Sequence, residues 1–396
     1  MFHRFIGLKM HLRSGKGIES SKRESVSKHN DGLSKKSHDL DHAHGKTAVK
    51  NEQRLQRTST ISSISKYIFF KLAKTLSVVA VVLYVVIPVV VKTNPWIQNK
   101  VIFLNNLRWP PFIDFTAPEG FGLESTRNFY LTTDQNIRLG LWHALPESLR
   151  DSKVPTDYYT DLLKSSKPII LYLHGNSGTR AGWHRVQLYK VLANMDYHVI
   201  AVDYRGYGDS SGSPSEDGVV SDALFVYRWI NQHKGDTPIF IWGHSLGTGV
   251  TTKLARTLCR NNEAPDGVFL ESGFNNILDA ATYHPMASPF RFIPWFNWLF
   301  LETITHNDIH FQSDVSIADV SPPLLILHAE DDVIVPYHLG VKLYEAAVKT
   351  RPQTYGAAEF VSFNASHRYG HKLIFMAPEL PDIIRKFMKR CLDGKK

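Results

Sequence analysis

The most continuous apolar segment of the chain lies near its N-terminal end. The run Thr75 to Val91 contains 17 residues without a charge. It extends over residues 67–91 if Lys71 and Lys74 place their amines at a membrane surface, and at about 1.5 Å per residue it spans a hydrocarbon core of about 30 Å. A buried strand would be far shorter than this run. We therefore predict a transmembrane anchor over residues 67–91, and not a buried core element.

A different pattern fills the C-terminal half, where short apolar runs alternate with helical patterns. Strands are predicted at Pro168–Leu173, His198–Asp203, Pro238–Trp242, Gly267–Leu270, Pro323–Leu327 and Glu359–Phe363. Helices are predicted at His184–Met195, Glu216–His233, Leu246–Cys259, Tyr337–Val348 and His371–Arg390. This alternation indicates an α/β fold, in which a mostly parallel sheet is covered by helices on both faces. Residues 101–160 are interpreted as a leading antiparallel region of the same domain.

Charge separates the N-terminal segment from the rest of the protein. The chain carries 46 Lys and Arg against 37 Asp and Glu, a formal charge of +9. Residues 1–74 hold 16 basic and 6 acidic residues, whereas residues 75–396 hold 30 and 31. The body is therefore almost neutral, which argues against nucleic acid as a partner. The only cysteines, Cys259 and Cys391, exclude a disulfide framework and a Cys-rich zinc site.

The basic N-terminal segment, residues 1–66, is predicted to be a disordered cytoplasmic tail. It is rich in Ser, Lys, Arg and His and lacks apolar periodicity, so it cannot bury enough surface to offset the entropy of ordering. Basic residues before the anchor outweigh those just after it, which favours a cytoplasmic N-terminus and places residues 92–396 across the membrane. A transit peptide over residues 1–17, which are basic and contain no acid, remains an alternative.

The pentapeptide Gly243 to Gly247 carries the strongest chemical signal. It reads Gly-His-Ser-Leu-Gly, follows an apolar strand and opens a helix with apolar residues at every fourth position. A G-x-S-x-G sequence in this context is typical of a nucleophile elbow, in which the serine is strained and the glycines leave room for a sharp turn. Ser245 is therefore the candidate nucleophile.

A serine nucleophile needs a base that is oriented by an acid, in the chain order Ser, acid, His. The acid is expected just after the apolar run LLILHA, where Glu330, Asp331 and Asp332 compete. The base is expected between the last strand and the last helix, which leaves His367 and His371. His328 lies within a predicted strand and is interpreted as a core histidine.

The tetrahedral intermediate of acyl transfer also needs two N–H donors. The backbone of Leu246, directly after the nucleophile, is one candidate. The other is expected from the strand-ending loop His174 to Gly178, through the N–H of Asn176. A phosphate-binding loop is disfavoured there, because the G-x-x-x-x-G-K-[S/T] pattern is missing.

An aromatic stretch lies between the fourth and fifth of the predicted parallel strands. Tyr283 to Phe300 contains 7 aromatic residues in 18, against 12% in the whole chain. We interpret residues from about 275 to 320 as a cap. Its aromatic side chains have two interpretations: a packed cap core, or else an acyl-chain pocket or membrane-facing lip.

Four phrases, LYLHGNSGTR, YRGYGDS, WGHSLGTGV and LILHAEDD, together resemble the α/β-hydrolase family. Within that family the chain is similar to a branch of membrane-anchored serine lipases, from near Tyr84 to the C-terminal helix. The resemblance implies an α/β-hydrolase catalytic domain over residues 92–396. The D-x-x-V-P turn implies Asp332 as the acid and keeps Asp331 as the fallback. The Gly-His pair implies His371 as the base, although NASHRYG departs from the expected glycine placement and keeps His367 open.

The resemblance has further implications for residues and function. Asp203 and Arg205, in DYRGYGDS, take structural roles. The protein is implied to be an endoplasmic-reticulum enzyme with a lumenal catalytic domain that hydrolyses lysophosphatidylserine and monoacylglycerols through an acyl-serine intermediate. No metal or organic cofactor is implied. Two alternatives stay open, namely an acyl-protein or small-molecule thioesterase and a catalytically silent binding protein with the same fold.

A single N-x-[S/T] sequon, Asn364-Ala365-Ser366, is present in the chain. Glycosylation of Asn364 requires that it face the lumen during synthesis, as the predicted orientation has it. The sequon lies seven residues before His371, so a glycan is tolerable only if Asn364 points away from the catalytic pocket.

Overall fold

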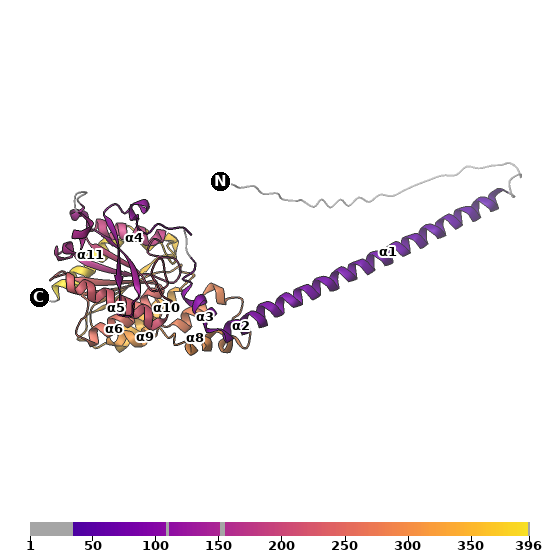
Figure 1. The fold of residues 1–396 in the computed structure, drawn as a ribbon. Helices are drawn as coiled ribbons and strands as arrows, with labels where there is room; N and C mark the ends of the chain where they lie inside the picture. Colours follow the sequence, from indigo (N-terminus) through magenta and orange to yellow (C-terminus); the bar gives the residue numbers. More distant parts are fainter. Residues whose placement is uncertain (1–34, 108–110, 151–154, 395–396) are drawn as a thin grey trace, which may run out of the picture. The chain divides into compact units, whose positions relative to one another are not determined.

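The computed structural model describes residues 35–107, 111–150 and 155–394 (Figure 1). The chain forms two units, which divide between Val78 and Val79. Residues 1–34 lie outside the described residues, and so does the transit-peptide alternative.

The described part of the first unit is helical. Helix α1 (Lys35–Val81) is exposed along almost its whole length from residue 46 onward. The prediction of a disordered tail is therefore wrong for residues 35–66. From residue 46 to residue 66 the chain contains no Gly or Pro and many good helix formers. Extending a helix from the apolar run costs much less than nucleating a new one, and this allows the polar segment to become helical.

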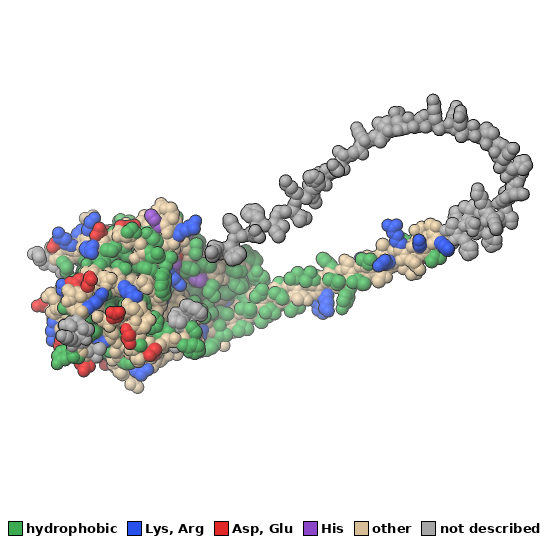
Figure 2. Space-filling model, turned by 90° about the horizontal axis from the view of Figure 1, so that it is seen from above, with side chains coloured by type: hydrophobic (Ala, Val, Ile, Leu, Met, Phe, Trp, Pro, Cys, Tyr) green, Lys and Arg blue, Asp and Glu red, His purple; other side chains and the backbone are tan. Residues whose placement is uncertain are grey.

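The helix continues into the second unit through a π-helical turn, η1 (Val82–Val86), and helix α2 (Ile87–Thr93). Pro88 has no N–H to donate to the carbonyl one turn earlier, which accounts for the widened turn before it. Residues Lys46–Thr93 form the one helix of the described chain that is long and apolar enough to cross a membrane. Figure 2 shows hydrophobic side chains along the C-terminal part of this helix and Lys and Arg toward its N-terminal part.

An eight-stranded sheet forms the centre of the second unit (Figure 1). Its strands are β1 (Thr126–Thr132), β2 (Arg138–Ala144), β3 (Ile169–Leu173), β4 (His198–Asp203), β5 (Ile239–His244), β6 (Gly267–Glu271), β7 (Leu324–Ala329) and β8 (Ala358–Phe363). The spatial order is β1-β2-β4-β3-β5-β6-β7-β8. Strands β3 to β8 pair in parallel, and β2 pairs antiparallel with both β1 and β4. The six predicted strands and the leading antiparallel region are thus confirmed.

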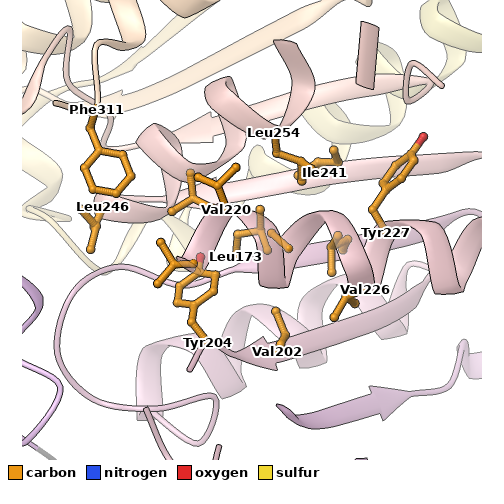
Figure 3. Packing of buried hydrophobic residues seen from close by; sticks show 14 of the residues in the cluster. Leu173, Val202, Tyr204, Val220, Val226, Tyr227, Ile241, Leu246, Leu254 and Phe311 are labelled. Carbon is orange, nitrogen blue, oxygen red and sulfur yellow. The ribbon is translucent and has the colours of Figure 1, made fainter. Parts of the chain in front are cut away.

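Helices cover both faces of the sheet, as predicted. Helices α4 (Trp183–Asn194) and α11 (Leu380–Asp393) pack on one face. The other face is covered by α5 (Glu216–His233), α6 (Leu246–Arg260) and α10 (Tyr337–Thr350). Figure 3 shows side chains of α5 and α6 packed over Leu173, Val202 and Ile241 of the sheet. Because both faces are buried, the central strands are apolar at nearly every position.

The predicted C-terminal helix is wrong in its first part. Helix α11 begins at Leu380, and only a short 3₁₀ turn, η10 (Ile374–Met376), precedes it. Pro378 disfavours helical backbone at Ala377, whereas Pro381 fits the first turn of α11, where its missing N–H has no intrahelical role. His371 therefore lies in a loop and not at the start of a helix.

A cap connects β6 to β7. It contains α7 (Ile277–Tyr283), η6 (Pro285–Ala287), η7 (Asn297–Leu301), α8 (Glu302–His306), α9 (Ser313–Ser316) and η8 (Ile317–Asp319). Ile293, Phe296 and Leu299 form a small buried cluster of their own, against which Tyr84 of η1 packs. Helix α3 (Pro95–Phe103) links α2 to the rest of the unit. Part of the aromatic stretch thus forms a packed cap core, the first of its two interpretations, since Phe296 is buried and Phe290 and Phe300 pack against it. The other four aromatic residues are exposed, namely Tyr283, Phe292, Trp295 and Trp298.

Candidate active site

Ser245 lies on the turn between β5 and α6 with φ 55° and ψ −122°, a strained conformation for a residue with a side chain. Its N–H donates to the carbonyl of Glu271 over 2.9 Å. A Cβ on Gly243 would lie 2.5 Å from the carbonyl oxygen of Gly247, and a Cβ on Gly247 would lie 2.1 Å from that of Leu173. The two glycines are therefore required by the close packing of the turn, as the sequence pattern indicates.

Asp332 and His371 are brought together from the turns that follow β7 and β8. The Asp332 Oδ2 lies 2.7 Å from the His371 Nδ1. The other carboxylate oxygen accepts the N–H groups of Ile334 and Val335, each over 2.9 Å. Burial alone would raise the pKa of Asp332, but His371, together with the nearby His328, holds that pKa below its usual value. The carboxylate is therefore ionised and fixed in direction.

The two alternatives for acid and base take other positions. Asp331 does not contact the His371 ring; its Oδ1 accepts the N–H of Gly370 over 3.0 Å and so tethers the loop that carries His371. His367 is exposed and stacks on Tyr369 with ring centroids 5.3 Å apart. Glu330 accepts the N–H of a loop residue after β8. Of the candidates, only Asp332 and His371 form a buried acid and imidazole pair.

His371 is held next to the nucleophile through His244. Its backbone carbonyl lies 2.8 Å from the His244 Nε2, and the two rings are 5.0 Å apart. No hydrogen bond joins the Ser245 hydroxyl to the His371 ring among the described residues. Catalytic hydrogen bonds are often long before substrate binds, so this geometry is compatible with a serine and histidine pair.

The loop after β3 supplies the second predicted N–H donor. Asn176, Ser245 and Leu246 all line one pocket. Within the described chain, no carbonyl accepts the N–H of Asn176 or of Leu246, so both remain available to a ligand. The loop is held from behind by the buried Arg185, whose guanidinium donates to the carbonyls of Gly175, Ser177 and Thr179.

Asp203 and Arg205 form separate ion pairs beneath these loops. Asp203 is fully buried and accepts two hydrogen bonds from Arg180, one from its backbone at 2.6 Å and one from its guanidinium at 2.7 Å. Arg205 pairs with the buried Asp222 at 2.7 Å. Neither side chain lines the pocket, which agrees with the predicted structural roles.

Glu271 is a buried acid that the sequence analysis did not single out. Its side chain accepts the indole N–H of Trp242 over 2.8 Å, and its backbone carbonyl holds the N–H of Ser245. Burial raises the pKa of Glu271 to about 7, and the Asp332 carboxylate adds to this effect. Glu271 ends β6, which pairs with β5, the strand that leads to Ser245. Only the strand order brings the two residues together, so the sequence alone contains no signal for Glu271. His328 is buried as expected, with its Nε2 2.9 Å from the carbonyl of Val335.

The pocket above Ser245 has a volume of about 250 Å³, many times the roughly 10–15 Å³ that one water molecule needs. Its lining is mostly apolar and comes from the N-terminal helices, the cap and the catalytic loops. The lining of the cap includes Met286, Phe290, Phe296 and Phe300. The second interpretation of the aromatic stretch, an acyl-chain pocket, is therefore compatible with its first. Among the described residues, no group of three or more His, Cys, Asp or Glu side chains could hold a metal ion.

Comparison with known proteins adds sequence relatives to this geometry. The family model of the α/β hydrolase fold matches residues 168–280. The lysophosphatidylserine lipase ABHD12 of Danio rerio is 48% identical over 309 residues, which cover 78% of this chain and 81% of the relative. That of Xenopus tropicalis is 50% identical, with 77% and 80% covered. Human protein ABHD12B is 37% identical, with 74% and 80% covered.

Solved structures share the fold at much lower identity. An α/β hydrolase from Vibrio vulnificus is 19% identical, with a TM-score of 0.55 over 74% of this chain and 92% of that one. The esterase Pf2001 of Pyrococcus furiosus is 18% identical, with a TM-score of 0.52 over 72% and 97%. At this level of identity the likeness shows the architecture of the sheet and helices alone.

Proposed function

The chain belongs to the ABHD12 family of α/β hydrolases, and from this premise we propose that it is a membrane-anchored serine lipase. Its substrates are single-chain lipids: lysophosphatidylserine, related lysophospholipids and monoacylglycerols. One observation carries the proposal beyond the family. The strained Ser245, beside the buried Asp332 and His371 pair, lies at a mostly apolar pocket that suits one acyl chain.

The proposed mechanism follows from the positions of these groups. The Ser245 hydroxyl attacks the ester carbonyl while its proton passes to the Nε2 of His371, the ring nitrogen opposite the one that Asp332 holds. The N–H groups of Leu246 and Asn176 stabilise the oxyanion. The glycerol oxygen leaves with the proton from His371, and an acyl-serine remains. Water, deprotonated by the same imidazole, then releases the fatty acid.

We further propose that the helix Lys46–Thr93 anchors the enzyme in the endoplasmic-reticulum membrane. Lys66, Lys71 and Lys74 precede its most apolar part, and the tail before them is also basic. This bias favours a cytoplasmic N-terminus and a lumenal catalytic domain. Asn364 is exposed, and its side chain caps the turn after β8, which is compatible with a lumenal glycan.

Hydrolysis of a lysolipid panel by purified full-length enzyme tests the catalytic proposal. We expect fatty-acid release by the wild type and none above background by Ser245→Ala, because this change removes the nucleophile and few packing atoms. Labelling of Ser245 by a fluorophosphonate reports the nucleophile independently. Activity on S-acylated proteins but not on lysolipids would favour the thioesterase alternative. An unlabelled Ser245 would favour a silent binding protein.

Protease protection of sealed microsomes tests the orientation. We expect the C-terminal domain to survive without detergent and the N-terminal tail to be digested. An endoglycosidase shift that Asn364→Gln abolishes would add independent support. Digestion of the C-terminal domain with survival of the tail would show that the catalytic domain faces the cytosol.

A further inference from the structure

The end of the apolar N-terminal helix contributes directly to the pocket above Ser245. Ile87 and Val91, one turn apart in α2, both line it, together with residues of α3 and of the cap. These two side chains belong to the same helix that is long and apolar enough to cross a membrane. We propose that this helix is one wall of the acyl-chain site and that the acyl chain enters from the bilayer alongside it. This inference rests on the proposed lipase function.

Aromatic contacts hold α2 and the preceding π turn against the cap. The Tyr84 ring lies 5.8 Å from that of Phe290 and 5.6 Å from that of Phe292. At the C-terminal end of α2, the Lys92 ammonium lies 4.3 Å from the centroid of the Trp298 ring and donates to the Trp298 carbonyl over 2.5 Å. The helix is thus fixed to the cap at both ends of the segment that lines the pocket.

A buried amide fixes the same helix to α3. Gln98 is only 4% exposed, and its Nε2 donates to the carbonyls of Val91 and Lys92 over 2.7 and 2.8 Å. Carbonyls in the last turn of a helix lack intrahelical partners, and the amide of Gln98 donates to two of them. The Val91 carbonyl also accepts the N–H of Asn94 over 3.3 Å. Gln98 lines the pocket itself, so the wall continues without a break from α2 into α3.

The wall reaches the surface that a membrane would cover. Ile87 lines the pocket and is also 43% exposed, so this part of the wall is accessible from outside the protein. Three tryptophans of α3 and the cap are also exposed, namely Trp96, Trp295 and Trp298. Tryptophan prefers the interface between headgroups and hydrocarbon. On this proposal the opening lies near the headgroup interface, where a lysolipid keeps its glycerol ester, and the acyl chain enters along α2 toward Ser245.

Labelling of Ser245 by alkyl fluorophosphonates of two chain lengths tests the wall without requiring ester turnover. Full-length enzyme in phosphatidylcholine vesicles is treated with a hexadecyl and with an ethyl fluorophosphonate, and the ratio of the two labelling rates is measured. Val91→Trp and Ile87→Trp place a bulky ring in the pocket. We expect the ratio of hexadecyl to ethyl labelling rates to fall about tenfold in each. Val90→Trp is the matched control, since Val90 is exposed on the same helix and does not line the pocket.

The outcomes separate the wall from the function. A tenfold fall in both wall variants, with a ratio within twofold of wild type in Val90→Trp, supports the proposal. An unchanged ratio in both wall variants, or an equal fall in the control, overturns it while the lipase function stands. Failure of both probes to label wild-type Ser245 contradicts the hydrolase function, and the proposal of the wall is then overturned with it. If the tryptophan variants misfold, Ile87→Ala and Val91→Ala replace them. Both changes widen the pocket and should also change the ratio of the labelling rates.

Discussion

The catalytic turns and the pocket wall are assembled in different ways. The turns after β3, β5, β7 and β8 lie at the carboxyl ends of parallel strands. The sheet therefore fixes the positions of Ser245, Asp332 and His371, and the last two are within hydrogen-bonding distance of each other. The wall comes from short helices and turns of the cap and the N-terminal segment, which pack on one another. We expect changes in the first region to alter hydrolysis of every ester and changes in the second to alter the choice among esters.

The largest effect is expected from the acid. Asp332→Asn should lower kcat by about 10³–10⁴-fold on both short and long esters, because the amide favours the wrong imidazole tautomer. Asp331→Asn is the control. Its side chain keeps an oxygen that can accept the Gly370 N–H, so kcat should stay within a few-fold of wild type. Steady-state kinetics on a butyryl and an oleoyl ester measure both, and a reversed ranking would move the acid to Asp331.

A structural effect is expected at the elbow. In Gly247→Ala the new Cβ would lie 2.1 Å from the Leu173 carbonyl oxygen, so strand and helix must separate. Overpacking of this kind costs about 1–3 kcal/mol or more, and thermal unfolding should show a lower Tm. Gly120→Ala is the matched control, because a Cβ there meets nothing within 4 Å. An equal Tm for the two variants would contradict the packing argument.

A pH effect is expected from the buried pair His143 and His198, whose rings lie 3.0 Å apart at Nε2 and Nδ1. Burial lowers the pKa of His198 to about 4 and that of His143 well below its usual value. The unfolded chain therefore binds more protons than the folded one below the ordinary histidine pKa of about 6.5, and stability present above that pH is lost as pH falls toward 4. Each histidine contributes at most about 1.4 kcal/mol per pH unit.

Unfolding free energies measured from pH 8 to 4.5 check this expectation. His198→Gln removes one titrating group and should flatten the curve below pH 6.5. An unchanged slope in that variant would assign the acid sensitivity to other groups.

The smallest effect is expected in the cap. Phe290→Ala removes a ring that lines the pocket and contacts Tyr84 and Phe300. The ratio of kcat/KM for an oleoyl ester to that for a butyryl ester should fall about tenfold, or roughly 1.4 kcal/mol. Phe292→Ala is the control, because Phe292 also contacts Tyr84 but is 70% exposed and does not line the pocket. A proportional loss on both esters would give Phe290 a merely structural role.

The sheet was predictable because its strands are apolar runs bounded by turn residues, and the chemistry sits where those runs end. Ser245 was identified by its glycines and by the strand before it. Choosing between Asp331 and Asp332, or between His367 and His371, needed the resemblance to a family, since both members of each pair lie in the same loop.

Other features depend on contacts between distant segments. Nothing local in Ile87 or Val91 distinguishes a pocket wall from the rest of an apolar helix, and Gln98 reads as an ordinary polar residue. The helix in residues 35–66 was not predicted, because their polar composition cannot bury enough surface to stabilise an independent fold. These residues instead extend a helix that continues into the apolar run. The late start of α11 was missed although Pro378 and Pro381 signal it.

The packing of the elbow also bears on how such proteins diverge. Gly243 and Gly247 are demanded by contacts with Thr251, Leu173 and each other, and none of these contacts involves a substrate. A lineage that abandoned catalysis while keeping the fold would still retain both glycines. The two glycines of the pentapeptide therefore report on the fold, whereas Ser245 is the nucleophile and His244 holds the loop of His371. A descendant with alanine at position 245 would look almost intact yet be inert.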